Sequence, residues 1–427
     1  MSKFIVGLDV GSSQIKAAIA EQKNQNEFVL KDLKRFPSMG MRRGMIDNFS
    51  DAAQSIGRAL QEINEDYPRS IRNLILSVGS EKVNIQTSKG VVAVSRADDE
   101  IYQDDIKRVT QSSQAINISP NRIILHPLTQ EFIVDGEEGI RDPLGMTGKR
   151  LEANSLIIDD FAPAVNNLTK CIEDLGGGVL DVIFSPLASA EATLTKNQKE
   201  LGVVLIDIGY GKTSIAIYEE QKLLHAAVVP IGSGHISNDL AIGLKIPVDV
   251  AEKIKLSFGS ASAKKALKKD SIDLNKIDER AQGNASKKFI AQIIEARLTE
   301  IFEYVNEEMK KVDRENQLPA GAVLLGGGSK LPGLIDLAKE KLGFSVQLAN
   351  PNLNFLQPDS AEISIEAEQI DFIPVIGLLL YNQLQYSPQS RIPGQAGSWL
   401  RQVLKYFIPW RKRRKKALKN LPPPLKR

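Results

Sequence analysis

The chain has 427 residues, of which 42% are apolar and 25% charged, and its formal net charge is +3. This composition is that of a soluble globular protein with enough apolar residues for two ordinary cores. A single cysteine excludes an internal disulfide, three histidines show no metal-ligand spacing, and the longest apolar run, around FIPVIGLLLYNQL, is too short to span a bilayer.

The first expected element is a hairpin near the N-terminus, and a second copy of it follows in mid-chain. The segments FIVGLDVGSSQIKAAIA and VVLIDIGYGKTSIAIYEE each contain an apolar strand, an Asp, a Gly-containing turn and a second strand. Asp9 and Lys16 are seven residues apart, as are Asp207 and Ser214, and a third strand candidate follows each hairpin. This pattern indicates an internal duplication.

Hairpins of this kind suit a phosphate ligand. The N–H groups of a tight Gly turn can approach an anion closely, and an Asp at the strand end can hold a hydrated cation beside it. Two copies that face each other from two lobes would clamp a Mg-nucleotide between them. A strand followed by D-x-G is also a common structural turn, so neither copy decides the matter alone.

A third glycine-rich segment, GAVLLGGGSKLPGLIDLAKEKLG, predicts a strand, then Gly326, Gly327 and Gly328, then a helix. Glycines leave space for a flat ring or a phosphate near a helix N-terminus. The alternative is a plain strand-to-helix connection with Ser329 as its cap. Residues 349–370, rich in Asn, Pro, Asp and Glu, then predict a long loop before the apolar closing helix GLLLYNQL.

The end of the chain is strongly basic. Eleven of the 55 Lys and Arg residues follow Gly397, without any Asp or Glu, so the rest of the chain carries 44 basic and 52 acidic residues. Before the basic run Arg411 to Lys416, the segment GSWLRQVLKYFIPW predicts a short amphipathic helix. Its proposed membrane-facing residues are Trp399, Leu400, Val403, Leu404, Phe407 and Trp410.

An apolar face with aromatic residues and flanking cations is typical of an interfacial helix on anionic lipid. A helix docked on the protein's own core is the alternative, but SPQSRIPGQAGS just before it has the composition of a flexible linker. Nucleic acid is not expected as a partner, because the aromatic residues are segregated from the cations rather than interleaved with them.

Two hairpins followed by a strand-GGG segment resemble the phosphate-1, phosphate-2 and adenosine motifs of the actin, Hsp70 and sugar-kinase superfamily. Between the hairpins, TSKGVVAVSRADDEIYQDDIKRV and RIILHPLTQEFIVDGEEGIRDPLGMTGKRLEANSLII look like the 1C subdomain of the bacterial cell-division FtsA family. The segments VVPIGSGHISNDLAIGLKIPVDVAEKIKLSFG and IIEARLTEIFEYVNEEMKK are similar to those that enter and leave subdomain 2B of that family. The resemblance covers residues 3 to 386.

The resemblance implies an α/β, actin-like, two-lobed ATPase fold with an FtsA-type 1C insertion and a C-terminal amphipathic helix. The expected division of the chain is 1–80 and 160–201 for subdomain 1A, 81–159 for 1C, 202–237 and 316–386 for 2A, 238–315 for 2B, 387–398 for a flexible linker and 399–427 for the membrane helix and polybasic tail.

Roles in an ATP site follow from the matched motifs. Asp9 and Asp207 would orient Mg²⁺ through water, and Glu252 and Lys255 would reach the ribose, although such i, i+3 pairs are common on exposed helices. Lys16 and Lys212 would supply charge or be solvated hairpin lysines. The phosphate turns comprise Gly11, Ser12 and Ser13 in the first hairpin and Gly209, Gly211, Lys212 and Thr213 in the second, and Gly326, Gly327 and Gly328 would face the adenosine.

One departure bears on catalysis. In fast-hydrolysing relatives an acidic or amide residue before a Pro positions the attacking water, and here the phrase VIFSPLASAEA places Ser185 there. A hydroxyl can hold a water but is a weaker base than a carboxylate. The resemblance therefore implies slow or absent ATP hydrolysis.

Function and partners also follow from the resemblance. It implies a protein that polymerises beneath the inner membrane at the division septum and tethers the FtsZ ring, with 1C serving neighbouring subunits and later division proteins. Arg297 matches the 2B position that contacts the acidic C-terminal peptide of FtsZ, or is a surface arginine paired with Glu300 or Glu303. The alternative is a PilM-like adaptor of a pilus or secretion assembly, which would not need a C-terminal lipid helix.

Overall fold

The computed structural model describes residues 3–24, 27–265, 270–354 and 356–386. The predicted linker, membrane helix and basic tail lie outside these residues. Along the chain the structure forms two compact units, the larger made of residues 1–87, 116–126 and 156–384 and the smaller containing residues 88–115 and 127–155.

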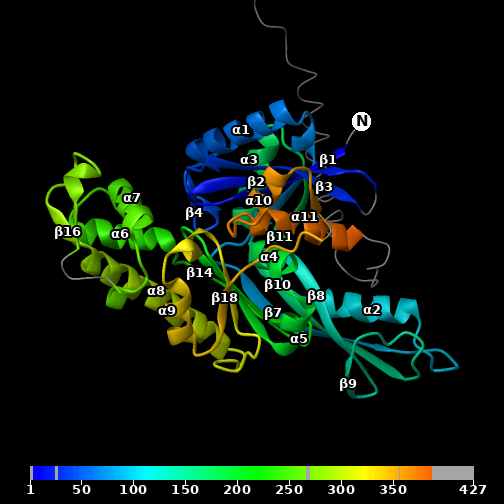
Figure 1. Ribbon diagram of the computed structural model, residues 1–427. Helices are drawn as coiled ribbons and strands as arrows, with labels where there is room; N and C mark the ends of the chain where they lie inside the picture. Colours follow the sequence, from blue (N-terminus) through cyan, green and yellow to red (C-terminus); the bar gives the residue numbers. More distant parts are fainter. Residues whose placement is uncertain (1–2, 25–26, 266–269, 355, 387–427) are drawn as a thin grey trace, which may run out of the picture. The chain divides into compact units, whose positions relative to one another are not determined.

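The larger unit contains a six-stranded sheet in the order β11-β6-β1-β2-β3-β19. Figure 1 labels β1, β2, β3 and β11 of this sheet. Strands β1 to β3 are antiparallel, whereas β6 runs parallel to β1, β11 parallel to β6 and β19 parallel to β3. The bounds are β1 (Lys3–Val10), β2 (Gln14–Gln22), β3 (Phe28–Pro37), β6 (Leu74–Val78), β11 (Val179–Phe184) and β19 (Leu356–Pro358).

A second sheet of the same unit has the order β14-β13-β12-β17-β18. Its strands are β12 (Val203–Ile208), β13 (Thr213–Glu219), β14 (Lys222–Val229), β17 (Ala322–Leu325) and β18 (Val346–Leu348). Here β12 to β14 are antiparallel, β17 runs parallel to β12 and β18 parallel to β17. This is the order and direction of β3-β2-β1-β6-β11 in the first sheet, so the predicted internal duplication is confirmed.

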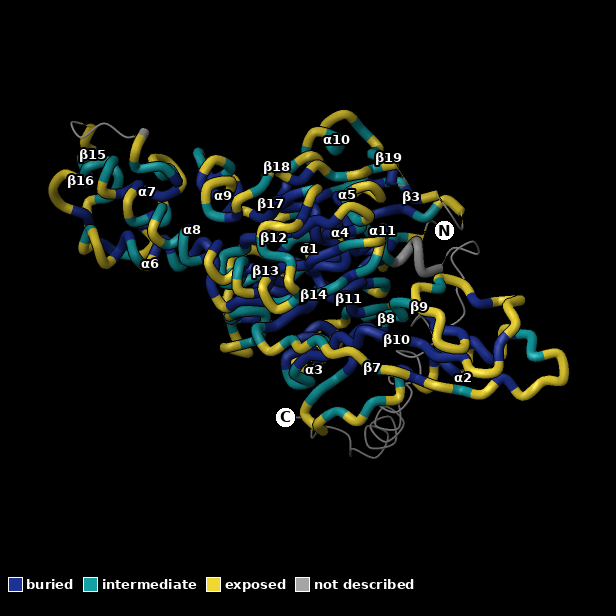
Figure 2. The backbone as a smooth tube through the Cα atoms, turned by 90° about the horizontal axis from the view of Figure 1, so that it is seen from below, coloured by how far each residue is buried: buried dark blue, intermediate teal, exposed yellow. Residues whose placement is uncertain are grey.

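The pairing of the two hairpins is also the same. Asp9 lies opposite Lys16 in β1–β2, and Asp207 lies opposite Ser214 in β12–β13. The apolar runs of the central strands are buried, as Figure 2 shows for β12, β13 and β17. Strands covered on both faces need such continuous apolar runs, which is why the two hairpins could be read from the sequence.

Helices and short turns complete the two-sheet part of the larger unit. Next to the first sheet, α1 and α3 pack against each other (Figure 1). The bounds are α1 (Phe49–Asp66), η1 (Ser70–Arg72), α3 (Ala162–Asp174), α4 (Ser185–Thr193), α5 (Lys196–Leu201), η4 (Gly327–Lys330), α9 (Leu334–Leu342), α10 (Ala361–Ala367) and α11 (Ile373–Tyr386), with the small hairpin β4 (Met41–Arg42) and β5 (Met45–Ile46).

Helices α6 (Ser233–Leu244), α7 (Val248–Phe258) and α8 (Lys287–Lys310) form a further group, with η2 (Ala263–Lys265), η3 (Leu274–Lys276) and the hairpin β15 (Ser271–Asp273) and β16 (Asn284–Ser286). Both α7 and α8 contact α6 (Figure 1). The buried positions of α8 recur every three or four residues, as in Ile290, Ile294, Leu298, Ile301 and Val305. This spacing places one apolar stripe along the helix against its neighbours.

The smaller unit is built on the sheet β7-β10-β8-β9 and one helix, α2. Their bounds are β7 (Asn84–Ala93), β8 (Arg122–Val134), β9 (Glu137–Ile140), β10 (Arg150–Phe161) and α2 (Gln103–Gln114). Residues 84–87 of β7, 122–126 of β8 and 156–161 of β10 belong to the larger unit. Its core includes Ile106 and Val109 of α2 and Phe132 and Leu151 of the sheet. An ideal Cβ at Gly90 would stand 2.3 Å from Ser113 N, so a glycine lets strand and helix approach closely.

The prediction of a long loop before the closing helix is wrong. Residues 349–370 do not form a long loop, because β19 and α10 lie within them. Leu356 pairs with Phe28 of β3, and the Ser360 side chain accepts a hydrogen bond from Ile363 N at the start of α10. The pairing of β19 depends on a strand more than 300 residues earlier, so local composition could not reveal it. None of the helices in the described ranges is long and apolar enough to cross a membrane.

Candidate functional site

The turns of the two hairpins have the same local geometry. Gly11 N donates to the Gln14 carbonyl over 3.0 Å, and Gly209 N donates to the Lys212 carbonyl over 3.0 Å. Ideal Cβ atoms at these two glycines would stand 2.8 and 3.0 Å from the carbonyl oxygens that close the turns. Both positions therefore favour glycine, for the tight turn that the sequence predicted.

The two turns lie next to each other. An ideal Cβ at Gly211 would stand 2.8 Å from the Ser12 Oγ atom and 3.6 Å from Arg43 N. Gly211 belongs to the second hairpin, whereas Ser12 belongs to the first. The structure thus brings together two turns that are about 200 residues apart in the sequence.

Asp207 is the most strongly perturbed carboxylate of this region. Burial raises its pKa to about 6, Lys16 and Lys212 act to lower that pKa, and Asp9 acts to raise it. Asp9, Asp207 and both predicted lysines therefore share one electrostatic environment. A cation placed between the two carboxylates would offset the cost of burying their charges.

The structure assigns Lys212 a contact that the sequence did not predict. Its Nζ donates to the carbonyl oxygen of Gly79, which directly follows β6. Burial lowers the pKa of Lys212, while the neighbouring carboxylates Asp9, Asp207 and Asp160 act to raise it. Lys212 is therefore not a solvated hairpin lysine.

Other predicted phosphate residues lie as follows. The Thr213 hydroxyl is buried and donates to the Ile231 carbonyl at 2.8 Å, so its side chain is already engaged. Ser13 accepts a backbone hydrogen bond from Ser38 N through its carbonyl oxygen. In the second turn the groups suited to a phosphate are hence backbone N–H groups rather than the Thr213 hydroxyl.

The glycine-rich segment lies beside the second hairpin. Gly326 has a φ of +85°, and an ideal Cβ there would stand 2.3 Å from Asp207 Oδ1. At Gly328 the Cβ would meet Ile208 Cγ2 at 2.5 Å, whereas at Gly327 no atom lies within 4 Å. Gly326 and Gly328 are thus required for close packing against β12, and Gly327 borders open space.

The element after these glycines differs from the prediction. A 3₁₀ turn, η4, follows directly, and the α-helix α9 begins only at Leu334. Ser329 does not cap a helix, because its hydroxyl donates back to the Leu325 carbonyl at 2.6 Å. Pro332 and Gly333 separate the turn from α9, and this Pro-Gly pair was the available signal for the break.

Glu252 and Lys255 lie on α7 and contact each other at 2.8 Å. Lys255 is buried, its Nζ donates to the Ser233 carbonyl at 3.0 Å, and the Tyr210 ring centroid lies 5.6 Å from that nitrogen. Tyr210 is part of the second phosphate turn. The predicted ribose residues are therefore next to that turn, although their pairing also satisfies both charges internally.

Ser185 is the first residue of α4 and is buried. The preceding Phe184 pairs with Val78, the last residue of β6, and an ideal Cβ at Gly79 would stand 3.0 Å from the Phe184 ring. Ser185 therefore directly follows β11. The neighbouring strand β6 ends just before Gly79, whose carbonyl oxygen accepts from Lys212. Gly79 was not predicted from the sequence, where its only signal is a glycine directly after the strand LILSV.

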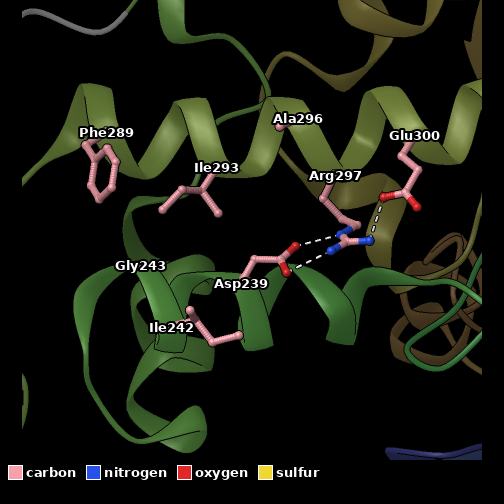
Figure 3. A pocket seen from close by; sticks show the side chains of 8 residues that line it. All are labelled: Asp239, Ile242, Gly243, Phe289, Ile293, Ala296, Arg297 and Glu300. Carbon is pink, nitrogen blue, oxygen red and sulfur yellow. Dashed lines mark hydrogen bonds and ion pairs between the residues drawn. The ribbon is translucent and has the colours of Figure 1, made fainter.

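Arg297 lines a separate pocket with a volume of about 390 Å³ between α6 and α8 (Figure 3). It donates to Asp239 through Nε at 2.6 Å and Nη2 at 2.8 Å, and to Glu300 through Nη1 at 2.5 Å. Glu300 was a predicted partner, whereas Asp239 was missed because it lies 58 residues away in the sequence. The side chains of Ile242 and Phe289 in the same pocket are exposed.

Comparisons with known proteins define the class first. The fold is similar to that of the PilM–PilN type IV pilus biogenesis complex, with a TM-score of 0.61 and 17% identity over 90% of this chain and 99% of that one. It is also similar to MreB5 of Spiroplasma citri, with a TM-score of 0.52 and 11% identity over 91% and 99% of the chains. Together with the duplicated sheets, this likeness identifies an actin-like, two-lobed α/β fold.

The family follows from sequence. Residues 204–368 match the family model "Cell division protein FtsA", and residues 80–159 match "SHS2 domain inserted in FTSA". The chain is 36% identical to the FtsA protein of Pseudomonas aeruginosa over 82% of this chain and 83% of that protein, and 33% identical to that of Bacillus subtilis over 82% and 79%. The chain belongs to the FtsA family of cell-division proteins. The PilM-like alternative is not favoured, because that likeness extends to the fold alone.

Proposed function

We propose that this cell-division protein binds ATP between its two hairpin turns and polymerises on the inner face of the cytoplasmic membrane, where it tethers FtsZ. The observation that supports the nucleotide part is the approach of Gly211 to Ser12, which brings the two glycine turns together, with Asp9 near enough to Asp207 to act on its pKa. Solved proteins of the same fold hold AMPPNP or ADP, which supports this proposal.

Asp9 and Asp207 suit Mg²⁺. Magnesium prefers oxygen ligands and usually keeps several waters, and a buried carboxylate with a raised pKa gains from a nearby divalent charge. When bound, the ion would neutralise phosphate charge. The Gly11 and Gly209 amides close the two turns, so the turn amides that follow them, up to Ser13 and Thr213, would bind the β- and γ-phosphates, with charge from Lys16 and Lys212.

Contacts to the ribose, the adenosine and the attacking water complete the proposed ATP site. Glu252 and Lys255 would hold the ribose, and Gly327, which borders open space, would face the adenosine. Ser185 would hold a water by its hydroxyl, a weak base, so that hydrolysis is slow and ATP acts mainly as a conformational ligand.

The pocket between α6 and α8 would receive the acidic C-terminal peptide of FtsZ. It combines the Arg297 guanidinium with the exposed apolar side chains of Ile242 and Phe289, and thus suits a peptide that carries both acidic and apolar residues. Residues 81–159 would serve as subdomain 1C for neighbouring subunits and later division proteins, and residues 238–315 as 2B.

The C-terminal segment would attach the assembly to anionic lipid through Trp399, Leu400, Val403, Leu404, Phe407 and Trp410. Sedimentation of the full chain with FtsZ and anionic liposomes tests the function as a whole. We expect FtsZ to sediment with liposomes only when the protein is present. If FtsZ stays in the supernatant although the protein itself sediments, the tether function is wrong.

A further inference from the structure

Helix α6 begins at the second phosphate turn. Ser233 N donates to the Gly209 carbonyl and Gly234 N to the Tyr210 carbonyl, both over 2.8 Å. The first N–H groups of a helix have no partner within it, so here the turn itself supplies the acceptors. A displacement of the turn must therefore move α6 or break both hydrogen bonds.

The same helix contacts the proposed ribose residues. The Ser237 hydroxyl donates to Glu252, and the Ser233 carbonyl accepts from Lys255 over 3.0 Å. The ring of Tyr210 also lies against the helix, because an ideal Cβ at Gly234 would stand 2.6 Å from it. The start of α6 is thus packed against the second phosphate turn and the proposed ribose residues.

Further along α6, Asp239 forms an ion pair with Arg297 in the pocket between α6 and α8. Its two carboxylate oxygens accept from Nε and Nη2 of Arg297 at 2.6 and 2.8 Å, as Figure 3 shows. Asp239 lies five residues after Gly234, or about 7.5 Å along a helix. A peptide carboxylate must compete with Asp239 for the guanidinium.

We propose that Asp239 is an internal competitor that holds Arg297 in a low-affinity arrangement, and that nucleotide binding weakens this pair by displacing α6 against α8. The inference rests on the proposed peptide pocket. Arg297 and Asp239 are joined by two hydrogen bonds at near-optimal distances. A movement of α6 that lengthens these bonds weakens the pair and makes the Arg297 guanidinium available to the peptide. Nucleotide therefore raises the affinity for the peptide, and by reciprocity the peptide raises the affinity for nucleotide.

The test uses the full chain and a fluorescein-labelled acidic C-terminal peptide of FtsZ, followed by anisotropy with and without Mg²⁺ and AMPPNP. For the wild type we expect at least about fivefold tighter peptide binding with nucleotide. For Asp239→Asn, which keeps an acceptor oxygen for Arg297, we expect about fivefold tighter binding without nucleotide and little further gain with it.

Glu300→Gln is the matched control. Glu300 also pairs with Arg297 but lies on α8 with it, so it does not move with α6. This variant should bind the peptide more tightly and keep the nucleotide dependence. Ser237→Ala removes one of the links between α6 and the nucleotide site, the hydrogen bond to Glu252, and it should keep the basal peptide affinity while reducing the nucleotide dependence.

Two outcomes would contradict this inference but not the proposed pocket. Either Asp239→Asn binds the peptide no more tightly than the wild type, or nucleotide leaves the peptide affinity of the wild type unchanged. If neither the wild type nor Glu300→Gln binds the peptide at all, the proposed pocket fails and the inference fails with it. Should Asp239→Asn not fold, as judged by its unfolding midpoint, the Ser237→Ala result decides in its place.

Discussion

Gly326 and Asp207 are so close that an ideal Cβ atom on Gly326 would stand 2.3 Å from the Asp207 Oδ1 oxygen. The strand β17 that precedes Gly326 runs parallel to β12, and Asp207 pairs with Leu325 across the two strands. The glycine-rich segment and the second hairpin are thus adjacent through sheet register. A change at one of them must displace the other.

Gly326→Ala should therefore weaken ATP binding by at least about tenfold. The added methyl must push aside the Asp207 carboxylate or the Ile208 carbonyl, and the φ of +85° is itself unfavourable for alanine. The dissociation constant from calorimetric titration, together with the thermal unfolding midpoint, measures this effect.

The matched control is Gly57→Ala, within α1, where the nearest atom to the new Cβ is Leu175 Cδ2 at 3.5 Å. It should stabilise the fold by about 0.5–1 kcal/mol and leave ATP binding unchanged. Wild-type affinity in a folded Gly326→Ala protein would show that the glycine segment does not border the nucleotide.

Arg297→Glu should abolish binding of the FtsZ peptide and leave ATP binding intact. The substitution replaces the cation of the pocket with a third carboxylate beside Asp239 and Glu300. Lys310→Glu makes the same charge change on α8, about 20 Å further along the helix, and should bind the peptide normally. Equal peptide affinity for wild type and Arg297→Glu would place the contact elsewhere.

Asp181→Asn should stabilise the protein at neutral pH but not at acidic pH. Burial raises the pKa of Asp181 to about 6, and the Val182 N–H opposes this shift with a 2.9 Å hydrogen bond to Oδ1. The folded state therefore holds the proton more tightly than the unfolded state, where the pKa is about 4. Stability falls as pH rises from about 4 through 6, and the whole loss is present at pH 7.

Because Asp181 is partly exposed, solvent screening limits the gain at pH 7.5 to about 1–2 kcal/mol. Denaturant unfolding at pH 4 and 7.5 measures it, with exposed Glu137→Gln as the control. An equal gain at both pH values would mean that charge burial is not the cause.

Removal of residues from Ser398 onward should release the protein from liposomes without loss of ATP binding. Burying Trp399 and Phe407 contributes about 1.5–3 kcal/mol each, and each nearby cation about 1 kcal/mol on anionic lipid. Trp399→Glu with Phe407→Glu should have nearly the same effect, although the basic run remains. If this double variant still floats with neutral liposomes, the predicted helix is not the anchor.

The hairpins could be predicted from sequence because their signals are local. An apolar run, an Asp and a Gly turn lie within about ten residues, and the duplication repeats them. The duplication also predicted that the two turns meet, but individual side-chain contacts between distant segments were not predicted, as for the donation from Lys212 to Gly79 across 133 residues. Asp239 was missed for the same reason, whereas Glu300, one helical turn from Arg297, could be anticipated.

The pairing of Glu252 with Lys255 shows a different limit. The i, i+3 spacing predicted that the two side chains meet, and they do. It could not show that Ser233 and Ser237 of α6 also bind this pair, because the contact depends on how two helices pack. Helix periodicity indicates which residues share a face but not what that face contacts.

Calorimetric titration of the full chain with MgATP, beside Asp9→Asn and Asp207→Asn, tests most directly whether the two hairpins form one nucleotide site. We predict one nucleotide per chain and a dissociation constant at least about tenfold higher in each variant, with an unfolding midpoint no lower than that of the wild type. Two independent sites per chain, or a wild-type dissociation constant in both folded variants, would contradict the shared site.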